Sequence, residues 1–185
     1  SDIKTEFPDE QADDLYSSTM DAVTQGTKNG LDMFLNISAM LIVVMALVFL
    51  LNAILGLLPN FNGDPITLEL ILGYIFVPLA WFMGIPWSEA IIAGELLGIK
   101  TTLNEFVAYP GLAALENGEL SDKSKLITFY SLCGFANLSS VGILISGITA
   151  MAPERKDDLI NVSFKALIGA TLASCMTGLI VGIFI

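Results

Sequence analysis

A long apolar run constrains the fold of this chain more than any other feature of its sequence. The run covers residues 31–58, "LDMFLNISAMLIVVMALVFLLNAILGLL", and has no charged residue after Asp32. About 20 apolar residues are enough for a helix to cross the hydrocarbon core of a bilayer. Asn36 and Asn52 lie toward the ends of the run, where water or a partner helix can satisfy their side chains. The run therefore predicts a transmembrane helix.

The composition indicates a membrane-embedded body that follows an acidic leader. The chain has 185 residues, of which 54% are hydrophobic and 15% charged, whereas about 25% of residues are charged in a typical soluble domain. Much of the net charge of −11 comes from the first residues. We expect residues 1–30 to form an acidic loop or a short surface helix. An acidic chain argues against nucleic-acid binding, which needs a basic surface.

Two further apolar segments have features that a simple spanning helix does not explain. Residues 66–87 are long enough to span, but Pro78 interrupts them, and Trp81 and Trp87 favour the membrane–water interface. Both a kinked spanning helix and an interfacial helix fit this segment. Residues 88–112 hold two apolar stretches of about ten residues, each too short to cross ~30 Å of hydrocarbon. We predict a re-entrant hairpin with its tip near "GIKTT".

The segment 125–153 has polar residues and glycines at the centre of an apolar run, "GFANLSSVG". Asn137 and Ser140 are three residues apart, so a helix would place them on one face. Gly134 and Gly142 would allow the helix to break, and such discontinuous helices hold substrates in many transporters. A stripe of small residues for helix packing is an equally good interpretation. Residues 159–185 predict a final transmembrane helix, which makes the chain an all-α membrane protein.

Glu105 and Phe135 are further candidates for a binding site. A carboxylate at membrane depth is costly and usually faces a cavity, so Glu105 is a candidate acceptor for the hydroxyl groups of a sugar. The alternatives are a structural pair with Lys100 and a carboxylate at the water boundary. Phe135, close to Asn137, could stack on a sugar or base, or could be an ordinary core phenylalanine.

The sequence offers little to an enzyme. It contains no histidine, which removes the usual general base and zinc ligand. The two cysteines, Cys133 and Cys175, lie within apolar runs, so we expect small packing residues and neither a disulfide nor a metal site. We find no nucleophile–base pair and no phosphate-binding glycine loop. The prediction is a non-enzyme without cofactor or metal in this chain.

Two motifs resemble a known family. "KTTLNEFVAY" and "YSLCGFANLSSVGILISGITAMAPERKDDL" are similar to the C-terminal half of the concentrative nucleoside transporters, and the likeness extends over nearly the whole chain. The resemblance implies a homotrimer in the plasma membrane that couples nucleoside uptake to a sodium or proton gradient by alternating access. It also implies two inverted repeats, each with a re-entrant hairpin and a discontinuous helix.

The resemblance further implies a role for each segment and each candidate residue. Glu105, Asn137 and Ser140 would contact the ribose, and Phe135 would pack near the sugar and base. The ion site and the first hairpin would lie outside these residues, so we expect a fragment of a longer chain. A non-transporting membrane structural or assembly subunit is the alternative. The implied segments are a scaffold helix with a trimer contact (31–58), an interfacial helix (66–87), a re-entrant hairpin (88–112) and a broken helix (125–153).

Overall fold

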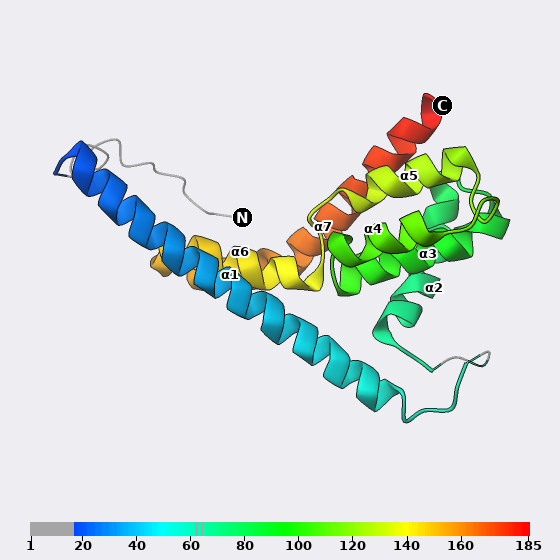
Figure 1. The fold of residues 1–185 in the computed structure, drawn as a ribbon, viewed down its shortest axis with the longest axis horizontal. Coiled ribbons are helices and arrows are strands. Elements are labelled where there is room, and N and C mark those ends of the chain that lie inside the picture. Colours follow the sequence, from blue (N-terminus) through cyan, green and yellow to red (C-terminus); the bar gives the residue numbers. More distant parts are fainter. Residues whose placement is uncertain (1–16, 62, 64) are drawn as a thin grey trace.

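The computed structural model describes residues 17–61, 63 and 65–185, so most of the predicted acidic leader lies outside the described residues. The described part is helical and contains no sheet (Figure 1). Its elements in chain order are α1 (Thr19–Leu55), α2 (Leu68–Phe82), α3 (Trp87–Thr102), α4 (Glu105–Ala114), α5 (Asp122–Leu132), α6 (Leu138–Met151), the 3₁₀ turn η1 (Pro153–Arg155) and α7 (Lys156–Ile183).

Helix α1 begins at Thr19 rather than at residue 31. Ser18 caps it by accepting a hydrogen bond from the backbone N–H of Asp21 at 3.2 Å, and no proline interrupts the residues that follow. The 37 residues of α1 rise about 55 Å, which exceeds the ~30 Å hydrocarbon core. Residues 19–30, expected as a loop or a short surface helix, therefore extend the membrane helix.

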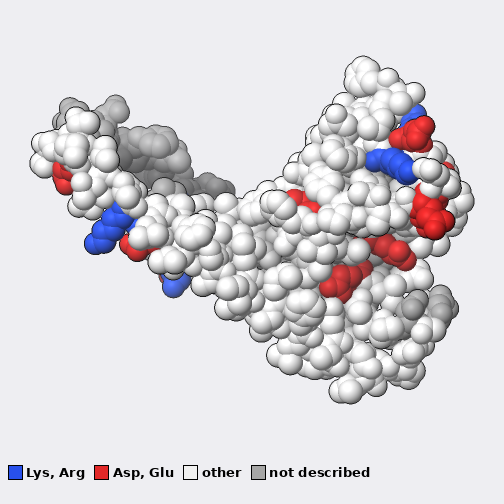
Figure 2. All heavy atoms as spheres, viewed as in Figure 1, with Lys and Arg blue, Asp and Glu red and all other residues white. Residues whose placement is uncertain are grey.

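Most of the surface of α1 is apolar and exposed, and Val48 is its buried residue. In the face drawn in Figure 2, charged side chains gather near the N-terminal end of α1, and the rest of its visible flank is uncharged. By length and composition, two segments are suited to crossing a membrane, namely α1 and the helical stretch Pro153–Ile183. These two segments agree with the first and last spans that the sequence predicts.

Helices α2 and α3 pack with their backbones almost in contact. A methyl carbon placed on Gly98 would lie 2.6 Å from the backbone nitrogen of Gly73, and one on Gly94 would lie 2.7 Å from the carbonyl oxygen of Gly73. Pro78 lies inside α2 without ending it. The 15 residues of α2 rise about 22 Å, less than the hydrocarbon thickness, which favours the interfacial alternative.

Two helix breaks lie where the sequence predicted irregular backbone, with different bounds. The hairpin breaks at residues 103–104, beyond the predicted tip, because α3 continues through Thr102. The second break lies between α5 and α6, at residues 133–137. Gly134 is within it, but Gly142 is within α6, where a methyl carbon on it would collide with the side chain of Met40 of α1. Gly142 thus serves helix packing, and Gly134 accompanies the break.

The buried core lies between α2, α3, α4, α5 and α7, the group of helices to the right in Figure 1. Cys175 of α7 belongs to this core with 3% of its surface exposed, as expected of a small packing residue. Cys133 is exposed instead, at the break after α5, and both thiols are free. Helix α1 contacts the remainder of the chain mainly through α6.

Candidate functional site

The N-terminal ends of α4 and α6 meet at the two breaks. Helix α4 starts at Glu105, and Asn104 caps it by accepting from the backbone N–H of Val107 at 3.1 Å. Helix α6 starts after Asn137, which is its N-cap. The first backbone N–H groups of a helix have no partner within it, so such ends attract anionic and hydrogen-bond-accepting groups. Two of them together define a polar centre between apolar helices.

Glu105 and Asn137 are joined directly at this centre. The side-chain nitrogen of Asn137 donates to a carboxylate oxygen of Glu105 at 3.0 Å. Asn137 is fully buried, whereas Glu105 is partly exposed. A carboxylate can accept several hydrogen bonds, so Glu105 has acceptor capacity beyond the bond with Asn137. The pair is therefore a buried donor held against an acceptor that a solute can reach.

Ser140 is adjacent to this pair, and its hydrogen bonds are local. The backbone N–H of Ser140 donates to Asn137 Oδ1 at 2.7 Å, and Ser140 Oγ accepts from the backbone N–H of Asn137 at 3.1 Å, which together form a capping box. The hydroxyl of Ser140 also donates to the backbone carbonyl of Asn137 at 2.6 Å. The three-residue spacing thus reflects a helix cap, and the cap fixes the amide of Asn137 in place.

Phe135 lies within the break, and its side chain is 49% exposed. With Ser140 it lines an apolar cavity of about 200 Å³ between α6 and α7. Glu105 and Asn137 are not among the residues that line this cavity. The structure thus joins three of the four candidate residues by hydrogen bonds, and places the ring of Phe135 next to them along the chain.

Three residues that the sequence did not single out also tie the hairpin to the break. Ser139 Oγ donates to the carbonyl of Leu103 at 3.4 Å. Lys100 Nζ donates to the carbonyl of Ser131 at 3.0 Å. Tyr109, four residues after Glu105 and therefore on the same face of α4, reaches the opposite side of the break. That spacing was the available signal for Tyr109.

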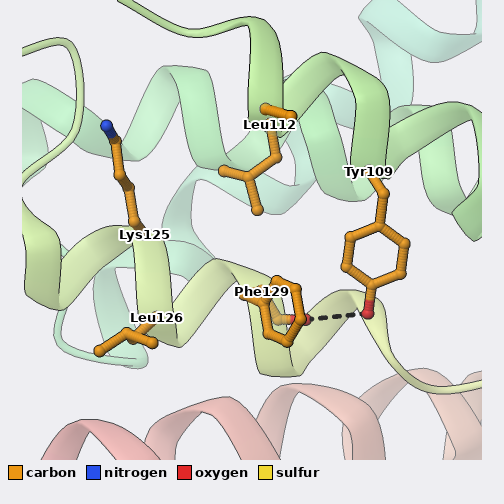
Figure 3. A pocket seen from close by; sticks show the side chains of 6 residues that line it. Tyr109, Leu112, Lys125, Leu126 and Phe129 are labelled. Atoms are coloured by element: carbon orange, nitrogen blue, oxygen red, sulfur yellow. Dashed lines mark hydrogen bonds between the residues drawn. The ribbon is translucent and has the colours of Figure 1, made fainter. Parts of the chain in front are cut away.

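The hydroxyl of Tyr109 hydrogen-bonds to Cys133 Sγ at 2.9 Å and to the carbonyl of Phe129 at 3.3 Å. Figure 3 shows the second of these bonds at the edge of a wide apolar hollow of about 640 Å³ between α4 and α5. Leu112, Leu126 and the stem of Lys125 also line the hollow (Figure 3). This hollow is separate from the polar centre, since neither Glu105 nor Asn137 lines it.

Lys100 does not form the direct ion pair with Glu105 that was the structural alternative. Its ammonium donates to a backbone carbonyl, and the salt bridge found among the described residues joins Arg155 and Asp158. Glu105 also lies away from a metal centre, since the described residues contain no cluster of three His, Cys, Asp or Glu. What the centre offers is a set of donors and acceptors for a neutral polar solute.

Apolar helices that break around such a polar centre define a class of protein, the secondary membrane transporters. A family model described as "Na+ dependent nucleoside transporter C-terminus" matches residues 1–182. The chain belongs to this family of Na+-dependent nucleoside transporters and is a membrane protein. The structural likeness agrees, with a TM-score of 0.83 and 38% identity to a CNTnw variant in an outward-facing state, over 92% of this chain and 44% of that one.

Named relatives share sequence over most of this chain. The nucleoside permease NupC of Helicobacter pylori is 42% identical over 92% of this chain and 42% of its own length. The uncharacterized transporter YutK of Bacillus subtilis is 39% identical over 99% and 45%, and the human solute carrier family 28 member 3 is 38% identical over 89% and 26%. The chain spans less than half the length of each of these relatives.

The match to solved structures depends on their conformation. CNTnw in an inward-facing substrate-bound state gives a TM-score of 0.68 at 38% identity, over 91% of this chain and 42% of that one. This is lower than the 0.83 for the outward-facing variant at the same identity. The arrangement of α1 to α7 is therefore more similar to the outward-facing form.

Proposed function

We propose that this chain is the C-terminal, nucleoside-binding part of a cation-coupled nucleoside symporter that carries nucleosides into the cell by alternating access. The observation that carries the proposal is the hydrogen bond between Glu105 and Asn137 at the meeting point of two helix breaks. The family match and the printed function of the NupC relative support it. The protein would reside in the plasma membrane as a homotrimer.

The site would bind the ribose of a nucleoside. Ribose presents neighbouring hydroxyl groups, and a carboxylate can accept a hydrogen bond from each through its two oxygens. Glu105 would accept these bonds, and Asn137 would donate its second amide hydrogen to a sugar oxygen. Ser140 would contact the ribose through its remaining acceptor capacity, and Phe135 would pack near the sugar and base.

The segments around the site would take the roles that the resemblance implies. Helices α3 and α4 would form a re-entrant hairpin, α5 and α6 the discontinuous helix of one repeat, and α1 the scaffold with the trimer contact. The site for the coupling ion, sodium or a proton, would lie outside this chain. This arrangement is supported by the break in each pair of helices and by the long exposed flank of α1.

Uptake of radiolabelled uridine tests this proposal. The full-length protein that carries this sequence would be expressed in cells that lack nucleoside transport, and uptake would be measured with and without sodium and proton gradients. We expect gradient-dependent uptake that unlabelled nucleosides inhibit. Well-expressed protein without uptake of uridine, adenosine or any other nucleoside would overturn the proposal in favour of a non-transporting membrane subunit.

A further inference from the structure

Lys100 is the largest fully buried side chain in the described part of the molecule. It lies near the C-terminal end of α3, and 1% of its surface is exposed. Removing a lysine ammonium from water is costly unless the charge is hydrogen-bonded or paired. Methionine or leucine would fill the same volume without this cost. The presence of a buried lysine here therefore points to a specific partner.

The partner of Lys100 is the exposed end of another helix. Its ammonium donates to the carbonyl of Ser131 at 3.0 Å, and Ser131 belongs to the last turn of α5. The last four carbonyls of a helix have no partner within it, and the negative end of the helix dipole favours a cation. Helix α5 has no basic residue in its own last turn, so Lys100 supplies this cation from α3.

The bond lies directly behind the polar centre. Lys100 is five residues before Glu105, and Ser131 is six residues before Asn137, so the bond joins the two segments that lead into the site. The ammonium also attracts the carboxylate of Glu105 electrostatically. A methyl carbon placed on Gly134 would lie 3.5 Å from Lys100 Nζ, which means that the ammonium packs against the break itself.

We propose that Lys100 is a positioning residue for the nucleoside site. By holding the C-terminal end of α5 against α3, it fixes the break relative to the hairpin, and so fixes Asn137 at hydrogen-bond distance from Glu105. Lys100 itself does not touch the solute. This inference rests on the proposed function, because its effect is read through the recognition of ribose at Glu105 and Asn137.

The test compares two nucleosides in three variants of the full-length protein. Lys100→Met removes the charge and the donor at similar volume, Lys100→Gln keeps a donor without the charge, and Lys100→Arg keeps both. Lys123→Met, on the exposed side of the same α5, is the matched control for loss of a lysine charge. The KM for uptake of uridine and of 2′,3′-dideoxyuridine, which lacks both ribose hydroxyls, is measured in proteoliposomes at matched protein content.

Misplacing the pair should weaken only the interactions with the sugar hydroxyls. We expect Lys100→Met to raise the KM for uridine roughly tenfold, and the KM for dideoxyuridine less than about twofold. Lys100→Gln should fall between Lys100→Met and the wild type, Lys100→Arg should restore part of the preference for uridine, and Lys123→Met should match the wild type.

Several outcomes would overturn the proposal. A KM that is unchanged, or raised by the same factor for both nucleosides, would remove Lys100 from the positioning of the site. Loss of monodisperse protein in Lys100→Met, Lys100→Gln and Lys100→Arg together would assign the residue to stability alone. Absence of uridine uptake by the wild-type protein would instead refute the proposed function, and this inference with it.

Discussion

The side-chain amide of Asn137 donates a 3.0 Å hydrogen bond to the carboxylate of Glu105, although 32 positions separate the two residues in the chain. Each residue stands at the N-terminal start of a helix that follows a break. The bond therefore joins the hairpin α3–α4 to the discontinuous pair α5–α6. A change at either residue should affect solute binding more than it affects the stability of the fold.

Replacing Glu105 with glutamine should impair uptake. Gln keeps the shape of the side chain but loses the charge that strengthens hydrogen bonds from ribose hydroxyls. Hydrogen bonds to charged groups contribute roughly 1.5–3 kcal/mol, so Glu105→Gln should lower kcat/KM for uridine about ten- to a hundredfold. Glu154→Gln, on the exposed η1, serves as the matched control. Near-normal uptake in a stably expressed Glu105→Gln variant would remove Glu105 from the site.

Variants of Asn137 should separate its two roles. Aspartate caps a helix about as well as asparagine, whereas alanine costs about 1 kcal/mol at an N-cap. Asn137→Asp should therefore preserve thermal stability but abolish most uridine uptake, because a carboxylate cannot replace the amide donor toward Glu105. Asn137→Ala should lower both. Equal uptake by Asn137→Asp and the wild type would show that the amide donor has no part in binding.

A methyl group at Gly98 should destabilise the packing of α2 on α3. The added carbon would meet backbone atoms of Glu69 and Gly73, and overpacking typically costs about 1–3 kcal/mol. Gly30 in α1 has no atom within 4 Å of the same position, so Gly30→Ala should be neutral or should stabilise the helix by up to about 1 kcal/mol. Thermal unfolding of the purified variants measures both. A Gly98→Ala variant as stable as Gly30→Ala would contradict the close approach.

The N-terminal end of α3 should contribute to the pH dependence of stability. Hydrogen bonds from Ser124 and Ser121 lower the pKa of Glu89 below its ordinary value of 4.5, and the two bonds from Ser121 measure 2.9 and 3.1 Å. The unfolded chain therefore takes up this proton at a higher pH than the folded protein, so the stabilisation exists above pH ~4.5 and is lost as pH falls.

The effect at Glu89 should be small, because the residue is mostly exposed and solvent screens its interactions. Melting temperatures of wild type and Glu89→Gln should converge between pH ~5 and ~3, since the wild type alone loses this contribution on acidification. A difference between the two proteins that stays constant over this range would exclude the ionised form of Glu89 as its source.

The sequence predicted the elements that depend on local pattern. The apolar runs of α1 and α7 are unambiguous because a membrane span needs about 20 apolar residues. The break between α5 and α6 was predicted because polar residues and Gly134 interrupt such a run. The start of α1 was wrong by a dozen residues, because a polar stretch without proline is compatible with both a helix and a loop.

The connections within the site were beyond local pattern. Asn137 and Ser140 were expected on one face of a helix, and they do lie together, but as an N-cap and its partner. The bonds from Asn137 to Glu105 and from Lys100 to Ser131 join residues more than 30 positions apart. Such pairs depend on how helices cross, and a single sequence does not record this. Lys100 in particular looked like part of a polar hairpin tip and is instead buried.

A structure of the full-length protein with uridine bound tests the central claim most directly. The account predicts ribose hydroxyl oxygens within about 3 Å of the Glu105 carboxylate, with the amide of Asn137 facing the sugar and Phe135 beside it. Uridine bound elsewhere, for example in the hollow beside Tyr109 and Phe129, with the bond between Glu105 and Asn137 undisturbed, would contradict it.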